Sequence, residues 1–125
     1  MAYTIHPSAD GNYIVLKVTG DISRELAMQY DIEAHKLGDE LGINRYLMDM
    51  TESRNVDSVM ESYKFAYDDL PETSTIDKSA CVALLVSPND HSHDFIETVT
   101  RNIGLNVTLF RDRDEAVNHL LENKQ

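Results

Sequence analysis

The sequence has 125 residues, 42% of them apolar and 26% charged, which is typical of a globular domain with its own core. Eleven lysine and arginine residues against 22 aspartate and glutamate residues give a formal charge of −11, which argues against nucleic acid and anionic membranes as partners. The single cysteine, Cys81, excludes an internal disulfide and a cysteine-based zinc site, and no apolar run is long enough for a transmembrane helix, so we expect a cytoplasmic protein.

The first part of the chain predicts two strands followed by a long helix. Residues 1–6 and 13–19 alternate apolar and polar side chains, and the turn between them is short enough for antiparallel pairing. Residues 20–23 close the second strand and open a helix that ends at Gly42 as its C-cap. Its predicted buried stripe consists of Leu26, Tyr30, Glu33/Ala34, Leu37 and Leu41. Gly38 interrupts this helix, and His35 is expected at the surface.

Residues 44–70 predict a buried strand, a loop and a second helix. The strand covers residues 46–50, the polar loop covers residues 51–56, and the helix opens at Asp57-Ser58 and ends before Pro71. At about 100° of rotation per residue, one face of the helix is expected to be buried, and Phe65 lies opposite it as an exposed apolar contact. That buried face consists of Val59, Tyr63, Ala66, Tyr67 and Leu70.

The remaining sequence predicts two more strands, each followed by a helix. Residues 80–86 are continuously apolar, as a strand covered on both faces would be, and residues 105–110 form the last strand. Asp112-x-x-Glu115 has capping-box spacing and opens the final helix. We therefore expect one α/β domain over residues 1–125, with about five strands in a mainly parallel sheet, an antiparallel N-terminal strand and four helices.

Asp49 and Ser58 are the candidate functional residues near the predicted carboxyl edge of this sheet. The carboxyl edge of parallel strands is where open α/β folds usually place their sites, and Asp49 ends the third strand. Ser58-x-x-Glu61 has the spacing of a capping box, which satisfies free backbone N–H groups at a helix start. A phosphate on Ser58 would lie at the positive end of the helix dipole, so a structural and a regulatory role both remain open.

The sequence offers no convincing catalytic or metal-binding set. His91 and His93 are two residues apart at a helix start, so they do not share a face, and no third ligand is implied nearby. Cys81 lies in the most apolar strand and is expected to be an inert core thiol. Without a nucleophile beside a base, a phosphate-binding loop or a dinucleotide fingerprint, we expect a protein that is not an enzyme and needs no cofactor or metal.

Three short motifs resemble the STAS domain, the fold of anti-sigma-factor antagonists, and especially its SpoIIAA-like branch. The residues Val18-Thr19-Gly20-Asp21 resemble the family's strand–glycine–acidic turn into the first helix. Leu47-Met48-Asp49-Met50, followed by Asp57-Ser58, resembles the family's strand aspartate that leads to an Asp-Ser pair. The segments Arg101-Asn102-x-Gly104, Phe110-Arg111-Asp112 and Glu115-Ala116-Val117 resemble the closing helix–strand–helix of the SpoIIAA-like branch.

This resemblance implies a bacterial regulatory protein that works by protein–protein interaction. In the family's antagonists the serine of the Asp-Ser pair is phosphorylated by an anti-sigma-factor kinase, which makes Ser58 the candidate phosphoacceptor and a kinase of that type a candidate partner. The candidate docking surface consists of Asp49, Asp57, Ser58 and Phe65. Family members are often dimers, so the resemblance also allows a homodimer.

A second hypothesis is a carrier or sensor of a small apolar or lipid-like ligand, as some SpoIIAA-like relatives are thought to be. The ligand would occupy a pocket between the sheet and the helices. Methionine and tyrosine side chains are adaptable pocket linings, although they are more often plain core. The candidate pocket residues are Met48, Met60, Tyr63 and Tyr67.

Overall fold

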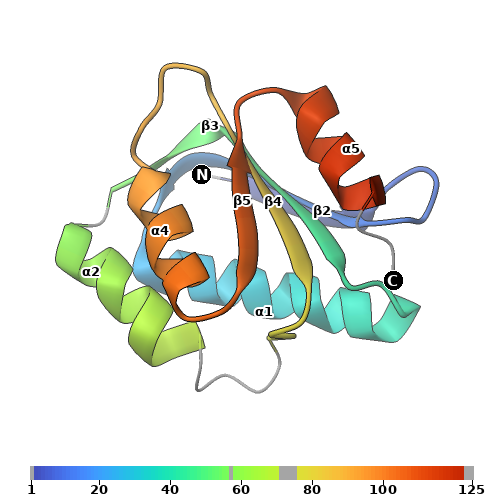
Figure 1. The fold of residues 1–125 in the computed structure, drawn as a ribbon, viewed down its shortest axis with the longest axis horizontal. Coiled ribbons are helices and arrows are strands. Elements are labelled where there is room, and N and C mark those ends of the chain that lie inside the picture. Colours follow the sequence, from blue (N-terminus) through green and yellow to red (C-terminus); the bar gives the residue numbers. More distant parts are fainter. Residues whose placement is uncertain (1, 57, 71–75, 123–125) are drawn as a thin grey trace.

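The computed structural model describes residues 2–56, 58–70 and 76–122 of the chain (Figure 1). Five strands and four helices lie in these ranges, if the π-helical turn η1 is taken as the continuation of α2. In chain order the elements are β1 (Ala2–Pro7), β2 (Ile14–Ile22), α1 (Arg24–Leu41), β3 (Arg45–Asn55), α2 (Val59–Lys64), η1 (Phe65–Asp69), β4 (Cys81–Val86), α4 (Asp94–Asn102), β5 (Asn106–Phe110) and α5 (Arg113–Glu122).

The sheet has the spatial order β1-β2-β3-β4-β5, so each strand pairs with the next one along the chain. β1 is antiparallel to β2, and the other three pairings are parallel. Parallel neighbours need a crossover connection, and a helix lies in each of the three connections. The predicted fold class, a mainly parallel five-stranded sheet with an antiparallel first strand and four helices, is confirmed.

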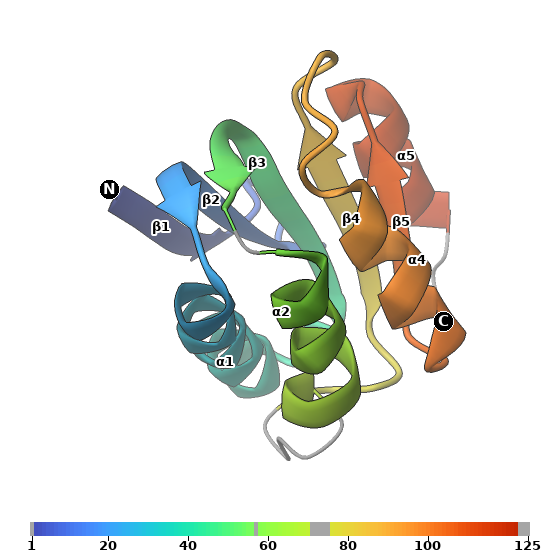
Figure 2. The same cartoon turned by 90° about the vertical axis from the view of Figure 1, so that its left-hand side faces the viewer.

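The helices cover the two faces of the sheet unequally. On one face lie α1, α2 with η1, and α4, and Figure 2 shows α2 between the other two helices. The core on this face combines alternate strand residues such as Leu16, Met48 and Leu84 with Tyr30 and Ala34 of α1. The opposite face is covered by α5, whose Ala116 and Leu120 pack on a smaller cluster of sheet residues (Figure 1). That smaller cluster contains Leu47, Cys81, Ala83 and Leu85.

β2 and β3 extend further than the sequence predicted. The predicted turn at Gly20 and the predicted loop over residues 51–56 are wrong, because β2 continues to Ile22 and β3 to Asn55. The extensions pair with each other, from Thr19 opposite Glu52 to Ile22 opposite Asn55, after a register shift between Lys17 and Thr19. Polar residues occupy this ribbon because one of its faces is open to solvent, which does not require an apolar pattern.

The buried stripe of α1 lies slightly to one side of the predicted one. Tyr30, Ala34, His35 and Gly38 are buried, whereas Leu41 is half exposed. The expectation that His35 lies at the surface is wrong, because its ring stacks on Tyr46 with ring centroids 4.2 Å apart. Gly38 is required by this close packing, since a Cβ atom there would lie 2.0 Å from the Tyr46 hydroxyl oxygen.

Candidate functional site

Ser58 caps α2, as the sequence predicted. Its hydroxyl oxygen accepts a hydrogen bond from the backbone N–H of Glu61 at 3.2 Å, which satisfies one of the free donors at the helix start. The Ser58 residue is exposed, so a kinase could reach it. Asp57, the other half of the predicted Asp-Ser pair, lies outside the described residues. The cap is confirmed, and the phosphoacceptor role stays a prediction.

Asp49 lies on the other face of the sheet from Ser58. Its side chain is 1% exposed, and its carboxylate forms an ion pair with Arg113 of α5. One carboxylate oxygen also accepts hydrogen bonds from the Thr51 N–H at 3.1 Å and the Thr51 hydroxyl at 2.7 Å. Burial opposes ionisation, but the Thr51 hydrogen bonds and Arg113 outweigh it and hold the pKa of Asp49 below its usual value. Asp49 therefore ties α5 to β3 and does not contribute to an exposed docking surface.

Phe65 is buried, which corrects the expectation that it is an exposed contact. It is 6% exposed and packs with Leu70 and Ile76. The predicted face was wrong for Phe65, Tyr63 and Tyr67, whereas Leu70 is buried as predicted. Residues 65–69 form a π turn. The backbone N–H of Leu70 bonds to the carbonyl of Phe65, so residues five apart come to lie on one face.

The three predicted pocket residues of this helix lie at the surface. Met60 is 60% exposed, Tyr63 47% and Tyr67 36%, and the two tyrosine rings stack on each other with centroids 4.3 Å apart. Single exposed apolar residues are ordinary, but three on one helix make a continuous apolar strip. We call Met60, Tyr63 and Tyr67 the outer face of α2. They do not line the cavity described next.

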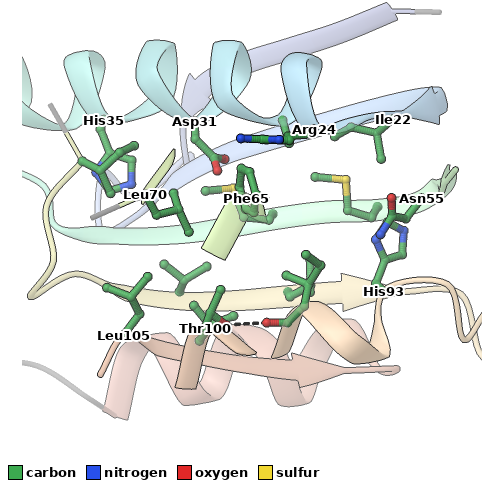
Figure 3. Close-up of a pocket in the computed structure, with 18 of the residues that line it drawn as sticks. Ile22, Arg24, Asp31, His35, Asn55, Phe65, Leu70, His93, Thr100 and Leu105 are labelled. Carbon is green, nitrogen blue, oxygen red and sulfur yellow. Dashed lines mark hydrogen bonds between the residues drawn. The ribbon is translucent and has the colours of Figure 1, made fainter. Parts of the chain in front are cut away.

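A cavity of about 120 Å³ lies between the sheet and the three helices that cover its larger core (Figure 3). Of the predicted pocket residues, Met48 lines it. Most of its wall is apolar, and it receives side chains from β2, β3, β4, β5, α1, η1 and α4. The apolar lining includes Ile22, Met48, Met50, Phe65, Leu70, Val82, Leu84, Ile96, Leu105 and Val107.

Two buried histidines lie at opposite ends of the cavity (Figure 3). The Nδ1 atom of His35 accepts the backbone N–H of Asp77 at 3.0 Å, and burial lowers the pKa of His35 to about 4. The Nε2 atom of His93 lies 3.3 Å from the carbonyl oxygen of Ser53, and burial also lowers the pKa of His93. Both rings are therefore uncharged near pH 7.

Arg24 joins two of the helices that wall the cavity. Its Nε and Nη2 atoms donate to the two carboxylate oxygens of Asp69 at 2.6 and 2.8 Å, in the bidentate arrangement typical of strong arginine–carboxylate pairs. Its Nη1 atom reaches Glu61 at 3.4 Å. These carboxylates raise the pKa of Arg24 above its usual value. The guanidinium thus holds α1 against α2 and η1.

Asp31 is the polar residue of the cavity that has no such partner. It lies on α1 between Ala27 and His35, which also line the cavity, and its carboxyl group points into it (Figure 3). Among the described residues, no side chain or backbone group forms a hydrogen bond or ion pair with this carboxyl group. Burial therefore raises its pKa to about 7.

Sequence reasoning missed Asp31, His35 and His93 as cavity residues. A signal for the first two was present, because Ala27, Asp31 and His35 recur every fourth residue beside the apolar stripe of α1. His93 has no such signal, since its burial depends on the distant ribbon of β2 and β3.

No group of three histidine, cysteine or acidic side chains in the described part of the chain is arranged to hold a metal ion. Cys81 is buried on the opposite face of the sheet, and burial raises its pKa, which disfavours the reactive thiolate. No helix among residues 2–56, 58–70 and 76–122 is long and apolar enough to span a membrane.

Comparison with solved structures identifies the fold. A crystal structure of an uncharacterised protein of the DUF3478 family with a SpoIIAA-like fold, from Shewanella loihica, matches with a TM-score of 0.50 at 18% sequence identity, over 95% of this chain and 92% of that one. The anti-sigma factor antagonist SpoIIAA in its unphosphorylated form matches with a TM-score of 0.54 at 10% identity, over 98% of this chain and 100% of that one. No family model matches the sequence, and no curated protein matches it.

Proposed function

We propose that this chain, which has a SpoIIAA-like STAS fold, is a non-enzymatic binding protein that binds a small apolar molecule in the cavity between its sheet and helices. The observation that carries this proposal is the cavity itself, a largely apolar space of about 120 Å³ that is partly open to solvent. Ligand pockets of proteins are typically concave and mostly apolar, with a few polar groups in the wall. The cavity volume is close to the roughly 150 Å³ of an apolar cavity that binds benzene.

The volume of the cavity matches a chain of about six carbon atoms or a single ring. A full-length fatty acid or phospholipid would extend beyond it into solvent. Two solved structures with this fold are an anti-sigma factor antagonist and an uncharacterised protein, and the antagonist supports a binding role. Location in a bacterial cytoplasm and the possible homodimer remain predictions from the sequence.

Titration with 1-hexanol, followed by ¹H–¹⁵N NMR, tests the proposal with two matched variants. Val82 and Val15 are both partly buried strand valines, but Val82 lines the cavity and Val15 packs on the α5 side of the sheet. Val82→Phe should fill the cavity and abolish binding, and Val15→Phe should leave binding unchanged. Native mass spectrometry of freshly purified protein should reveal a bound small molecule. Wild-type protein that shows no saturable shifts with hexanol would contradict the proposal.

A second candidate function rests on the outer face of α2, the exposed strip of Met60, Tyr63 and Tyr67 beside Ser58. Exposed apolar residues gathered on one helix favour a protein partner, and the resemblance supplies an anti-sigma-factor-like kinase as its class. Tyr63→Ala combined with Met60→Ala should abolish capture of that partner from host extract. Ser58→Asp, which keeps a capping side chain, should do the same if phosphorylation controls docking. Capture that survives all three changes would exclude this surface.

A further inference from the structure

The cavity lining includes one carboxyl group, that of Asp31, for which the described residues provide no partner. Asp31 lies half-buried on the wall formed by α1, and the residues around it are mostly apolar. Buried polar groups in proteins are normally hydrogen-bonded, and buried charges are normally paired. An unpaired carboxyl group aimed into an apolar space is therefore best explained by a ligand that supplies the missing partner.

We propose that the cavity recognises an amphipathic amine, with its protonated nitrogen paired to the carboxylate of Asp31 and its apolar body among Met48, Phe65 and Leu84. This inference rests on the proposed function, because it assigns a ligand class to the same cavity. A primary or secondary ammonium group carries the donors and the charge that a buried carboxylate lacks. The remaining volume suits an apolar body of about six carbon atoms.

The other charge classes of ligand fit the lining less well. An anionic ligand would need a free cation in the wall, but Arg24 is already bound by Asp69 and Glu61. The rings of His35 and His93 are uncharged near pH 7 because burial lowers their pKa values. The formal charge of −11 also repels anions during the encounter.

The charge on Asp31 gives the binding a defined pH dependence. The titratable groups that line the cavity with it are Arg24 and His35 on α1, Asp77 before β4, and His93 before α4. The lining contributed by β2, β3, β4, β5, η1 and α4 among the described residues is uncharged. Because the pKa of Asp31 in the empty cavity is about 7, the fraction of ionised carboxylate falls from about nine tenths at pH 8 to about one tenth at pH 6. Amine affinity should therefore fall about tenfold between these pH values.

A comparison of three ligands of one shape tests the inference. Hexylamine, 1-hexanol and hexanoate share a six-carbon chain and differ in the charge of the terminal group. Isothermal titration of the full chain at pH 8 should show hexylamine binding at least tenfold more tightly than hexanol, and hexanoate most weakly. Asp31→Asn should remove the advantage of the amine while hexanol still binds. Asp39→Asn, a matched change at an exposed position of the same helix, should preserve the advantage.

The outcomes separate this inference from the proposed function. If hexanol binds and hexylamine binds no more tightly, the ligand class is wrong and the cavity remains a binding site. If hexanoate binds most tightly, the inference is wrong, because the cavity then prefers a negatively charged ligand. If none of the three binds, both proposals fail. Should Asp31→Asn not fold, an amine affinity that is equal at pH 6 and pH 8 in the wild-type protein would still overturn the inference.

Discussion

Replacing Asp31 with asparagine should stabilise the empty protein at pH 8 and leave its stability nearly unchanged at pH 4. The carboxyl group titrates near 3.8 in the unfolded chain and near 7 in the folded protein. Below pH 4 both states bind the proton, and the folded state has no penalty. As the pH rises through 7, the unfolded state has released its proton and the folded state must hold a desolvated charge. About three pKa units correspond to an upper bound of about 4 kcal/mol on the stability lost between pH 4 and pH 8, because Asp31 is half-buried and solvent screens part of the penalty.

The assay is urea denaturation of both variants at half-unit steps between pH 4 and pH 8. The free energy of unfolding of Asp31→Asn minus that of the wild type should rise with pH and level off above pH 7. Other titrating groups cancel in this difference because both proteins contain them. A difference for Asp31→Asn that does not change with pH would refute the claim that this carboxyl group is desolvated in the folded protein.

Three further substitutions test the structural reasoning, each by urea denaturation at pH 7. Ser58→Ala should cost about 0.5–2 kcal/mol through loss of the cap, while Ser58→Asn should be nearly neutral; equal losses would contradict the capping role. Gly38→Ala should cost about 1–3 kcal/mol because the new methyl group would lie 2.0 Å from the Tyr46 hydroxyl oxygen and 2.7 Å from the Ile43 carbonyl oxygen. Tyr46→Phe removes the first of these contacts, so the two changes together should be less than additive by at least about 0.5 kcal/mol. Arg113→Gln should cost about 1–3 kcal/mol because Asp49 keeps its charge in a buried position, and no loss would argue against that ion pair.

The features that could be predicted from the sequence depend on neighbouring residues. The continuous apolar run from Ala80 predicted a strand covered on both faces, and β4 is such a strand. Ser58 and Gly42 were identified as caps because capping needs only a side chain or a left-handed backbone at one position. The alternation of strands and helices then restricts the sheet to a mainly parallel one.

The candidate site depends on contacts that no local pattern contains. The exposed face of the second helix was predicted wrongly because the burial of Phe65 depends on its packing against Leu70, Ile76 and residues of α1 and α4, which the helix's own residue pattern does not contain. Asp49 was assigned to the docking surface because it lies near the end of the predicted strand, yet its partner Arg113 comes from the last helix, 64 residues later. Asp31 lines the cavity and has no partner among the described residues. This can be recognised only from the positions of the surrounding elements, so the sequence alone does not reveal it.

The sequential order of the sheet has a consequence for how the chain folds during synthesis. Each new strand pairs with the one made just before it, so β1 to β4 can assemble from the N-terminus by local steps with little loop-closure entropy. The second face of the sheet is covered by α5, which is the last of the described elements to be synthesised. Until α5 packs on the sheet, Leu47, Ala83 and Leu85 face water on a parallel sheet that is otherwise complete. The nascent chain is therefore most prone to aggregation in the interval between the synthesis of β5 and the docking of α5, when this apolar surface is formed and still uncovered.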